Sequence, residues 1–134
     1  MKMAEARKLP ELFVARPARV RIVLVVLVPA ILGGIAGLVL APVPALYILI
    51  QLVAAIGGLL AGLEHRNVGE AALRGLGGGF FFGIGIIGLH ALSGGDDHHY
   101  LGQLPIVLPV ITAAFGALFA AIGSLVRRRI EPAT

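Results

Sequence analysis

The sequence predicts an all-α integral membrane protein whose four transmembrane helices form two helical hairpins. Hydrophobic residues make up 58% of the 134 residues and charged residues only 13%, whereas a soluble domain averages about 25% charged residues. A chain of this length cannot bury so much apolar surface in one core. In addition, four uncharged stretches each reach the roughly 20 residues that a membrane-crossing helix needs. These observations exclude an ordinary soluble enzyme and a disordered protein.

Each predicted span is an apolar segment that contains no Asp, Glu, Lys or Arg. The spans cover residues 22–41, 43–63, 75–93 and 105–126. Together they define a transmembrane domain, residues 22–126, between a basic leader, residues 1–21, and a basic tail, residues 127–134. The leader is expected either to lie in the membrane interface with a short helix beginning near Pro10 or to be a frayed tail. The first apolar run exceeds the roughly 7–15 residues of a signal peptide, so we expect it to be retained.

Basic residues predict the orientation of the chain. All 11 lie before the first span, between the second and third spans, or after the fourth span. They are Lys2, Arg7, Lys8, Arg16, Arg19, Arg21, Arg66, Arg74, Arg127, Arg128 and Arg129. The positive-inside rule therefore predicts a plasma (inner) membrane protein with both termini in the cytoplasm. The same residues explain the pI of about 10.4, and they predict contact with anionic lipids rather than with nucleic acid.

Small residues recur at four-residue spacing in every span, a pattern that lets helix backbones approach closely. The third span has glycines on more than one side of the helix. Because each helix of a simple bundle needs only one contact face, this surplus predicts contacts between chains and hence a homo-oligomer. The positions of this predicted glycine zipper are Gly33 and Gly37 in the first span, Gly58 and Gly62 in the second, and Gly75, Gly79 and Gly83 in the third.

Polar side chains within the spans are few, and they are functional candidates because a polar group in a bilayer is costly. Gln51, His90 and Thr112 all fall in the predicted outer half of the membrane. One interpretation is that they line a shared vestibule or pore. The other is local bonding, in which Gln51 contacts a neighbouring helix and Thr112 bonds the carbonyl four residues earlier in its own helix.

The outer connection, residues 94–104, holds two acidic and two imidazole side chains in succession. In a symmetric oligomer, Asp96 and Asp97 would form an acidic ring, and such rings at pore mouths favour cations. His98 and His99 are weaker candidates as metal ligands, because four adjacent residues reach one ion with difficulty. The alternative is a solvated polar loop.

The inner connection carries the densest mixture of acidic, imidazole and guanidinium groups in the chain. Glu70 and Arg74 are four residues apart in the order that favours a helical ion pair. Glu64, next to His65, is expected to pair with Arg66 or Arg74. This cluster is interpreted either as a structural feature that fixes the turn, or as an inner gate or a docking surface for a partner.

Neither a catalytic motif nor a phosphate-binding loop is found in the sequence, and it has no Cys. We therefore expect no enzyme activity and no cofactor; a membrane-embedded enzyme would have only the sparse polar residues of the spans to work with. The leading hypothesis is a homo-oligomeric channel or transport subunit that prefers cations. The alternative is a non-catalytic accessory or scaffold subunit that packs against a larger membrane partner.

Overall fold

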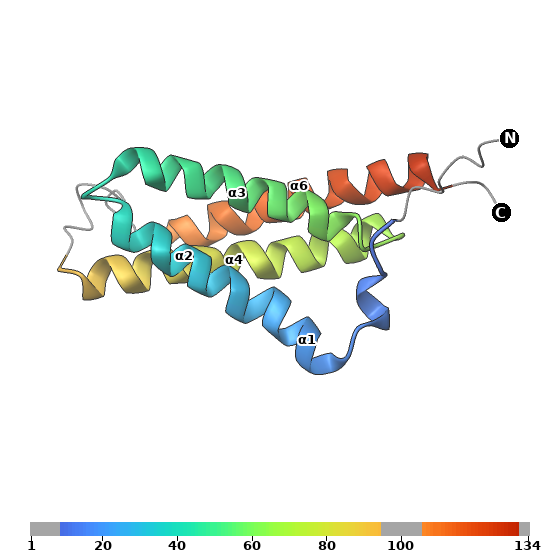
Figure 1. Cartoon of the computed structure of the whole chain (residues 1–134), viewed down its shortest axis with the longest axis horizontal. Coiled ribbons are helices and arrows are strands. Elements are labelled where there is room, and N and C mark those ends of the chain that lie inside the picture. Colours follow the sequence, from blue (N-terminus) through green and yellow to red (C-terminus); the bar gives the residue numbers. More distant parts are fainter. Residues whose placement is uncertain (1–8, 95–105, 132–134) are drawn as a thin grey trace, which may run out of the picture.

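The computed structural model describes residues 9–94 and 106–131, and these residues form helices and turns without a strand. The chain has four long helices, which lie side by side (Figure 1). They are a first helix, Ala18–Val39, made of α1 (Ala18–Ile22), η2 (Val23–Leu27) and α2 (Val28–Val39), followed by α3 (Pro44–Gly62), α4 (Val68–Leu92) and α6 (Val107–Ile130). The prediction of an all-helical chain with four helices long and apolar enough to cross a membrane is confirmed.

The first helix contains one wide turn, the π-helical segment η2. Pro29 follows this segment, and a proline ring clashes with the carbonyl four residues earlier, here that of Val25. The wide turn avoids this clash, because the N–H of Val28 donates to the carbonyl of Val23 in the i→i+5 pattern of a π-helix. Pro29 is thereby accommodated inside the helix instead of ending it.

Local sequence signals explain where α3 and α4 begin. Pro44 lies in the first turn of α3, where its missing N–H is not needed. Asn67 caps α4, because its Oδ1 accepts the N–H of Glu70 at 3.2 Å. The helix α4 therefore begins at Val68, well before Gly75, where the predicted apolar span begins. A helix start depends on capping, whereas the apolar span was predicted from hydrophobic length and the absence of charge.

Close backbone contacts hold α4 between α2 and α6. Gly75, Gly79 and Gly83 face α6, and a Cβ at each of them would overlap backbone atoms of that helix. Gly33 and Gly37 of α2 meet the backbone of α4 in the same way. The glycines of the third predicted span thus contact both neighbours, because Gly85, unlike the three that face α6, meets the backbone of α2.

The packing of these small residues does not require a second chain. Gly62 of α3 and Gly123 of α6 each meet the backbone of the partner helix, so a third interface is also formed within the chain. A Cβ at Gly58 would meet only the side chain of Phe119. In the described part of the chain, a Cβ at Gly57 or Gly88 would meet no atom within 4 Å. The surplus of small faces that predicted a homo-oligomer is therefore largely explained by contacts inside one chain.

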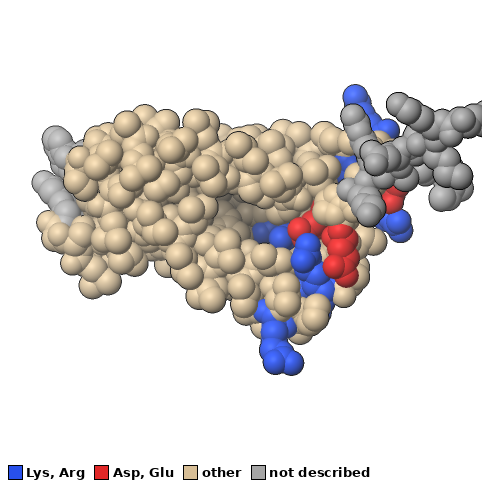
Figure 2. All heavy atoms as spheres, viewed as in Figure 1, with Lys and Arg blue, Asp and Glu red and all other residues tan. Residues whose placement is uncertain are grey.

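One cluster of buried apolar side chains lies between α2, α3 and α4. Its members are Ala36, Ile50, Phe82 and Ile86, with Tyr47 packed against them. Most other large apolar side chains are exposed along the outside of the bundle. Figure 2 accordingly shows a surface without charged groups over most of the length of the molecule. This distribution is typical of helices that face lipid.

Candidate functional site at the charged end of the bundle

Charged side chains gather at one end of the molecule, which we call the charged end (Figure 2). Three segments form it: residues 9–17, the α3–α4 connection with the start of α4, and the last turn of α6 (Figure 1). The predicted gate or docking residues of the inner connection all belong to this region. Arg16 and Arg127, which lie far away in the sequence, join them.

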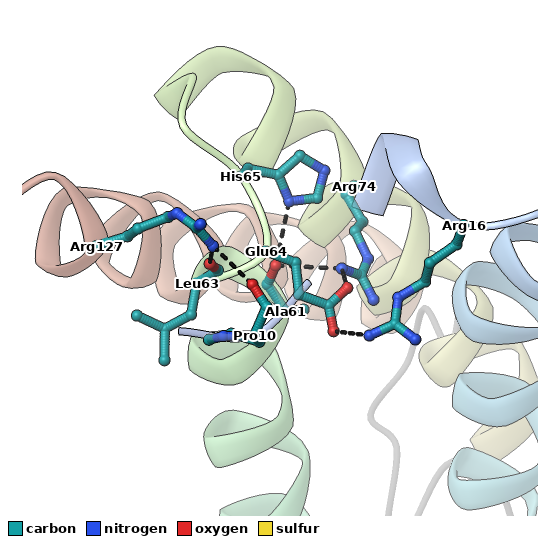
Figure 3. A network of polar contacts seen from close by, with 8 residues as sticks. All are labelled: Pro10, Arg16, Ala61, Leu63, Glu64, His65, Arg74 and Arg127. Atoms are coloured by element: carbon teal, nitrogen blue, oxygen red, sulfur yellow. Dashed lines mark hydrogen bonds and ion pairs between the residues drawn. The ribbon is translucent and has the colours of Figure 1, made fainter. Parts of the chain in front are cut away.

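Glu64 is the centre of the charged end. Its two carboxylate oxygens accept hydrogen bonds from separate guanidinium groups (Figure 3). Arg16 Nη2 lies 3.1 Å from Oε1, and Arg74 Nη1 lies 2.5 Å from Oε2. The side chains of Glu64 and Arg74 are only 14% and 9% exposed, and that of Arg16 is 27% exposed. Charge-assisted bonds of this kind are among the stronger hydrogen bonds in proteins. The predicted pairing of Glu64 with Arg74 is confirmed.

The expected ion pair between Glu70 and Arg74 does not form in the described structure. Arg74 points toward α3 instead, where its Nη1 also donates to the carbonyl of Ala61 at 3.2 Å. An exposed i,i+4 pair contributes only about 0.2–0.5 kcal/mol, so a buried carboxylate and a carbonyl are the better partners. Glu70 is exposed and contributes its backbone N–H to the Asn67 cap.

Arg66 turns away from Glu64 and binds the end of α6. Its Nε and Nη2 donate to Oε1 of Glu131 at 3.0 and 2.8 Å. These hydrogen bonds hold the pKa of Glu131 below its usual range, with a further lowering by the charge of Arg127. The pair is exposed to solvent on the Arg66 side. It links the α3–α4 connection to α6, an arrangement that local sequence spacing could not indicate.

His65 is buried between the connection and the leader. Its Nδ1 lies 3.1 Å from the carbonyl of Ala61, and since a carbonyl only accepts, Nδ1 carries the proton. The ring packs against Phe13 with 5.2 Å between centroids, and the guanidinium of Arg74 lies 4.1 Å from the centre of the Phe13 ring. Burial lowers the pKa of His65 from 6.5, although the hydrogen bond to Ala61 raises it. Burial thereby favours the neutral imidazole.

The described part of the leader is fixed to this cluster. The N–H of Phe13 donates to the carbonyl of Glu64 at 3.0 Å, and Arg127 Nη1 donates to the carbonyl of Pro10 at 3.0 Å (Figure 3). Between residue 9 and the start of α1, the 3-10 turn Phe13–Ala15 is the helical part. From Leu9 onward, the leader is therefore not a frayed tail, and its first helical turn begins at Phe13 instead of near Pro10.

Two further hydrogen bonds, besides the Arg66–Glu131 pair, hold α6 against the α3–α4 connection. Arg127 Nη1 donates to the carbonyl of Leu63 at 2.6 Å, and Ser124 Oγ donates to the carbonyl of His65 at 3.0 Å. The side chain of Arg127 is 6% exposed, and Ser124 is fully buried. Neither role was predicted from the sequence, and the same holds for the contacts of Phe13 and Arg16. The one available signal was a serine and an arginine on consecutive turns at the end of an apolar helix.

The three polar candidates of the predicted outer half occupy different environments. Thr112 Oγ1 donates to the carbonyl of Leu108 at 3.0 Å in its own helix, as the local interpretation expected. His90 is buried against α2, with Nδ1 at 3.3 Å from the carbonyl of Gly37. Gln51 is half-buried on α3. In the described structure these contacts do not bring the three side chains to one site.

Other predicted sites lie outside the described residues. Asp96, Asp97, His98 and His99 fall in residues 95–105, which the structure does not describe. Within residues 9–94 and 106–131, no group of three His, Cys, Asp or Glu side chains could hold a metal ion. The charged end is therefore the one described region in which several functional candidates meet.

A shallow depression of about 440 Å³ lies beside this cluster. Its lining residues are Arg66, Asn67, Val68, Gly69 and Arg128. The first turn of α4 leaves backbone N–H groups without partners in the helix, and both charged residues of the lining are basic. Such a surface favours the binding of acidic groups.

Comparisons of the chain with protein families, curated proteins and solved structures found no match.

Proposed function

We propose that this chain is a non-catalytic subunit of a larger membrane assembly. In this proposal the helices form two hairpins in the plasma membrane, both termini lie in the cytoplasm, and the charged end lies at the cytoplasmic surface. The distribution of the eleven basic residues supports this orientation. The tight helix packing supports a scaffold role, because the glycine contacts bring backbones together and leave little space for a conduit inside one chain.

The observation that carries this proposal is the basic depression beside a preformed polar cluster. Arg66 and Arg128 are exposed at its lining, and because Arg66 is paired with Glu131, Arg128 supplies the charge for a partner. The leader, the connection and α6 are already bonded to one another. A partner that presents an acidic segment would meet a surface whose backbone is already ordered, so it would lose little conformational entropy on binding. The predicted docking role of Arg66 belongs to this proposal.

The experiment compares two neighbouring charge reversals on the full chain. The tagged protein is purified from its native membrane in mild detergent, and native mass spectrometry measures its complexes. We expect a defined heteromeric complex that Arg128→Glu abolishes. Arg129→Glu, which changes the same charge outside the lining of the depression, should leave the complex intact. Equal loss in both variants, or a protein that is always free of a partner, would contradict the proposal.

A second candidate function is a homo-oligomeric channel with a preference for cations. Two open small residues favour it, because Gly57 and Gly88 leave room for another helix to approach. The acidic pair Asp96 and Asp97 would then stand at the outer mouth. A discrete assembly of three or more identical chains, with ion flux in liposomes that loses cation preference in Asp96→Asn/Asp97→Asn, would favour this function. A monomer without flux would eliminate it.

A further inference from the structure

The first half of the first helix is attached to the bundle differently from the second half. We call this half, α1 and η2 at residues 18–27, the arm. In the described structure no side chain of the arm is buried, whereas four residues of α2 are buried. The arm approaches α4 through η2, where a Cβ at Gly77 would lie 3.2 Å from Val25 Cγ1, and α1 packs mainly against η2 itself. In α2, by contrast, Gly33 and Gly37 meet the backbone of α4. Packing therefore fixes α2 firmly and the arm weakly.

A hinge lies between the arm and α2. The wide turn η2 ends at Leu27, and Pro29 follows in the first turn of α2. Because Pro29 has no N–H, the hydrogen-bond ladder of the helix lacks one donor where the two parts join. Prolines and wide π-helical turns are the usual causes of kinks in helices. The first helix diverges from the rest of the bundle toward the charged end (Figure 1), and a hollow separates it from α3 there (Figure 2). The arm therefore has both a pivot and free space beside it.

The leader fixes the position at which the arm begins. Arg16 pairs with Glu64 at 3.1 Å, and Pro17 alone separates Arg16 from Ala18, the first residue of the arm. Two residues of chain span at most about 7 Å, so the start of the arm cannot lie far from this ion pair. The N–H of Phe13 also donates to the carbonyl of Glu64 at 3.0 Å. A displacement of the leader from Glu64 would therefore displace the start of the arm.

We infer that the arm is a hinged element that pivots at the turn before Pro29 and that the leader latches to the charged end. The latch consists of the contacts that Arg16 and Phe13 make with Glu64. Helices in lipid associate through close packing and polar contacts, so the arm is free to swing once the latch opens, while the glycine contacts of α2 keep the second half in place. The fold thus couples the charged end to a helix inside the membrane. This inference goes beyond the proposed function and does not depend on it, because every contact lies within one chain.

The test measures distances between two spin labels in the full chain, reconstituted in liposomes, by double electron–electron resonance. The sequence has no Cys, so the labels occupy introduced cysteines. The arm pair is Ile22→Cys with Leu125→Cys on α6, and the reference pair is Leu38→Cys on α2 with Ile111→Cys on α6; all four native side chains are exposed. Ile22 lies about 10 Å from Pro29 along the helix axis. A swing of about 20° at the hinge would therefore move it by about 3–4 Å.

Arg16→Gln weakens the latch next to the arm. Arg19→Gln is the matched control, because Arg19 is an exposed arginine on the arm itself. We expect Arg16→Gln to widen the distance distribution of the arm pair and to leave the reference pair unchanged, whereas Arg19→Gln should change neither distribution. Pro29→Ala supplies the missing N–H at the hinge. When it is added to Arg16→Gln, the distribution of the arm pair should become narrower again.

Four outcomes would overturn the inference. Three of them are an unchanged arm pair in Arg16→Gln, equal widening in Arg16→Gln and Arg19→Gln, and equal widening of the arm pair and the reference pair. The fourth is widening that persists after Pro29→Ala is added, since this would indicate fraying of the arm and not rotation at a hinge. If Arg16→Gln does not fold, Phe13→Ala replaces it with the same expected result, because it removes the ring that packs against His65.

Discussion

Replacing Gly33 by alanine should separate α2 from α4. An added Cβ would overlap the carbonyl oxygen of Phe82 and would lie 2.8 Å from its carbonyl carbon. Neither atom can rotate away as a side chain can, so the two helix backbones must move apart. Overpacking a close interface typically costs about 1–3 kcal/mol. The cost is expected near the top of this range, because the same contact continues through Gly37 on the next turn.

Gly57→Ala is the matched control for this substitution. It adds the same methyl group to a helix, but a Cβ at Gly57 meets no atom within 4 Å in the described structure. Alanine is the better helix former by roughly 0.5–1 kcal/mol, so this variant should be as stable as the parent or slightly more stable. The two variants therefore bracket the effect of helix propensity and isolate the effect of backbone contact.

The assay is thermal or denaturant unfolding of both purified variants in the same mild detergent. Gly33→Ala should lower the free energy of unfolding, while Gly57→Ala should not. If Gly33→Ala were as stable as Gly57→Ala, the backbones of α2 and α4 would not be in contact at this position. The assignment of the glycine rows to contacts within one chain would then be wrong.

Three further predictions concern the charged end. The folded-state pKa of His65 lies below 6.5, so the stability that neutral His65 contributes is complete above pH 6.5 and is lost as the pH falls toward the lowered pKa. Between pH 7.5 and 5.5, the melting temperature of the parent should therefore fall more than that of His65→Gln. Equal falls in melting temperature would refute this prediction. Arg127→Met should destabilise the chain by about 1–3 kcal/mol and speed hydrogen exchange at the Phe13 amide; unchanged exchange would show that Arg127 does not hold the leader. Arg66→Ala removes an exposed pair with Glu131 and should leave the melting temperature almost unchanged; a large drop would assign this pair a structural role.

The apolar helices could be predicted from the sequence because the bilayer imposes a length and excludes charge. The start of α4 could not be predicted in that way, since Val68 to Arg74 is helical without being apolar. The Asn67 cap marks the true start. The polar candidates differ in the same respect. Thr112 bonds within its own helix, as a local rule states, whereas His90 depends on the approach of a helix far away in the sequence.

The composition of the sequence indicates the charged end, but most of its ion pairs and hydrogen bonds could not be predicted. Glu64 and Arg74 belong to one short connection, so their pairing could be predicted. Whether Arg74 pairs with Glu64 or with Glu70 depends on where α3 ends relative to α4, and local sequence spacing does not specify this. Arg16 and Arg127 reach the cluster only because the first helix begins, and α6 ends, at the same side of the molecule. The orientation of Phe13 between His65 and Arg74 has the same origin.

The glycine contacts and the charged end have complementary roles in the fold. Smooth small-residue faces allow close approach, but they present few features that would stop one helix from sliding along another. Hydrogen bonds from Ser124 and Arg127 of α6 to the carbonyls of His65 and Leu63 fix α6 against the α3–α4 connection. A shift by one helical turn, about 5.4 Å, would break both bonds and leave buried polar groups unpaired. We infer that this polar cluster sets the helix register, so that the glycines of α4 and α6 meet at the positions where a side chain would not fit.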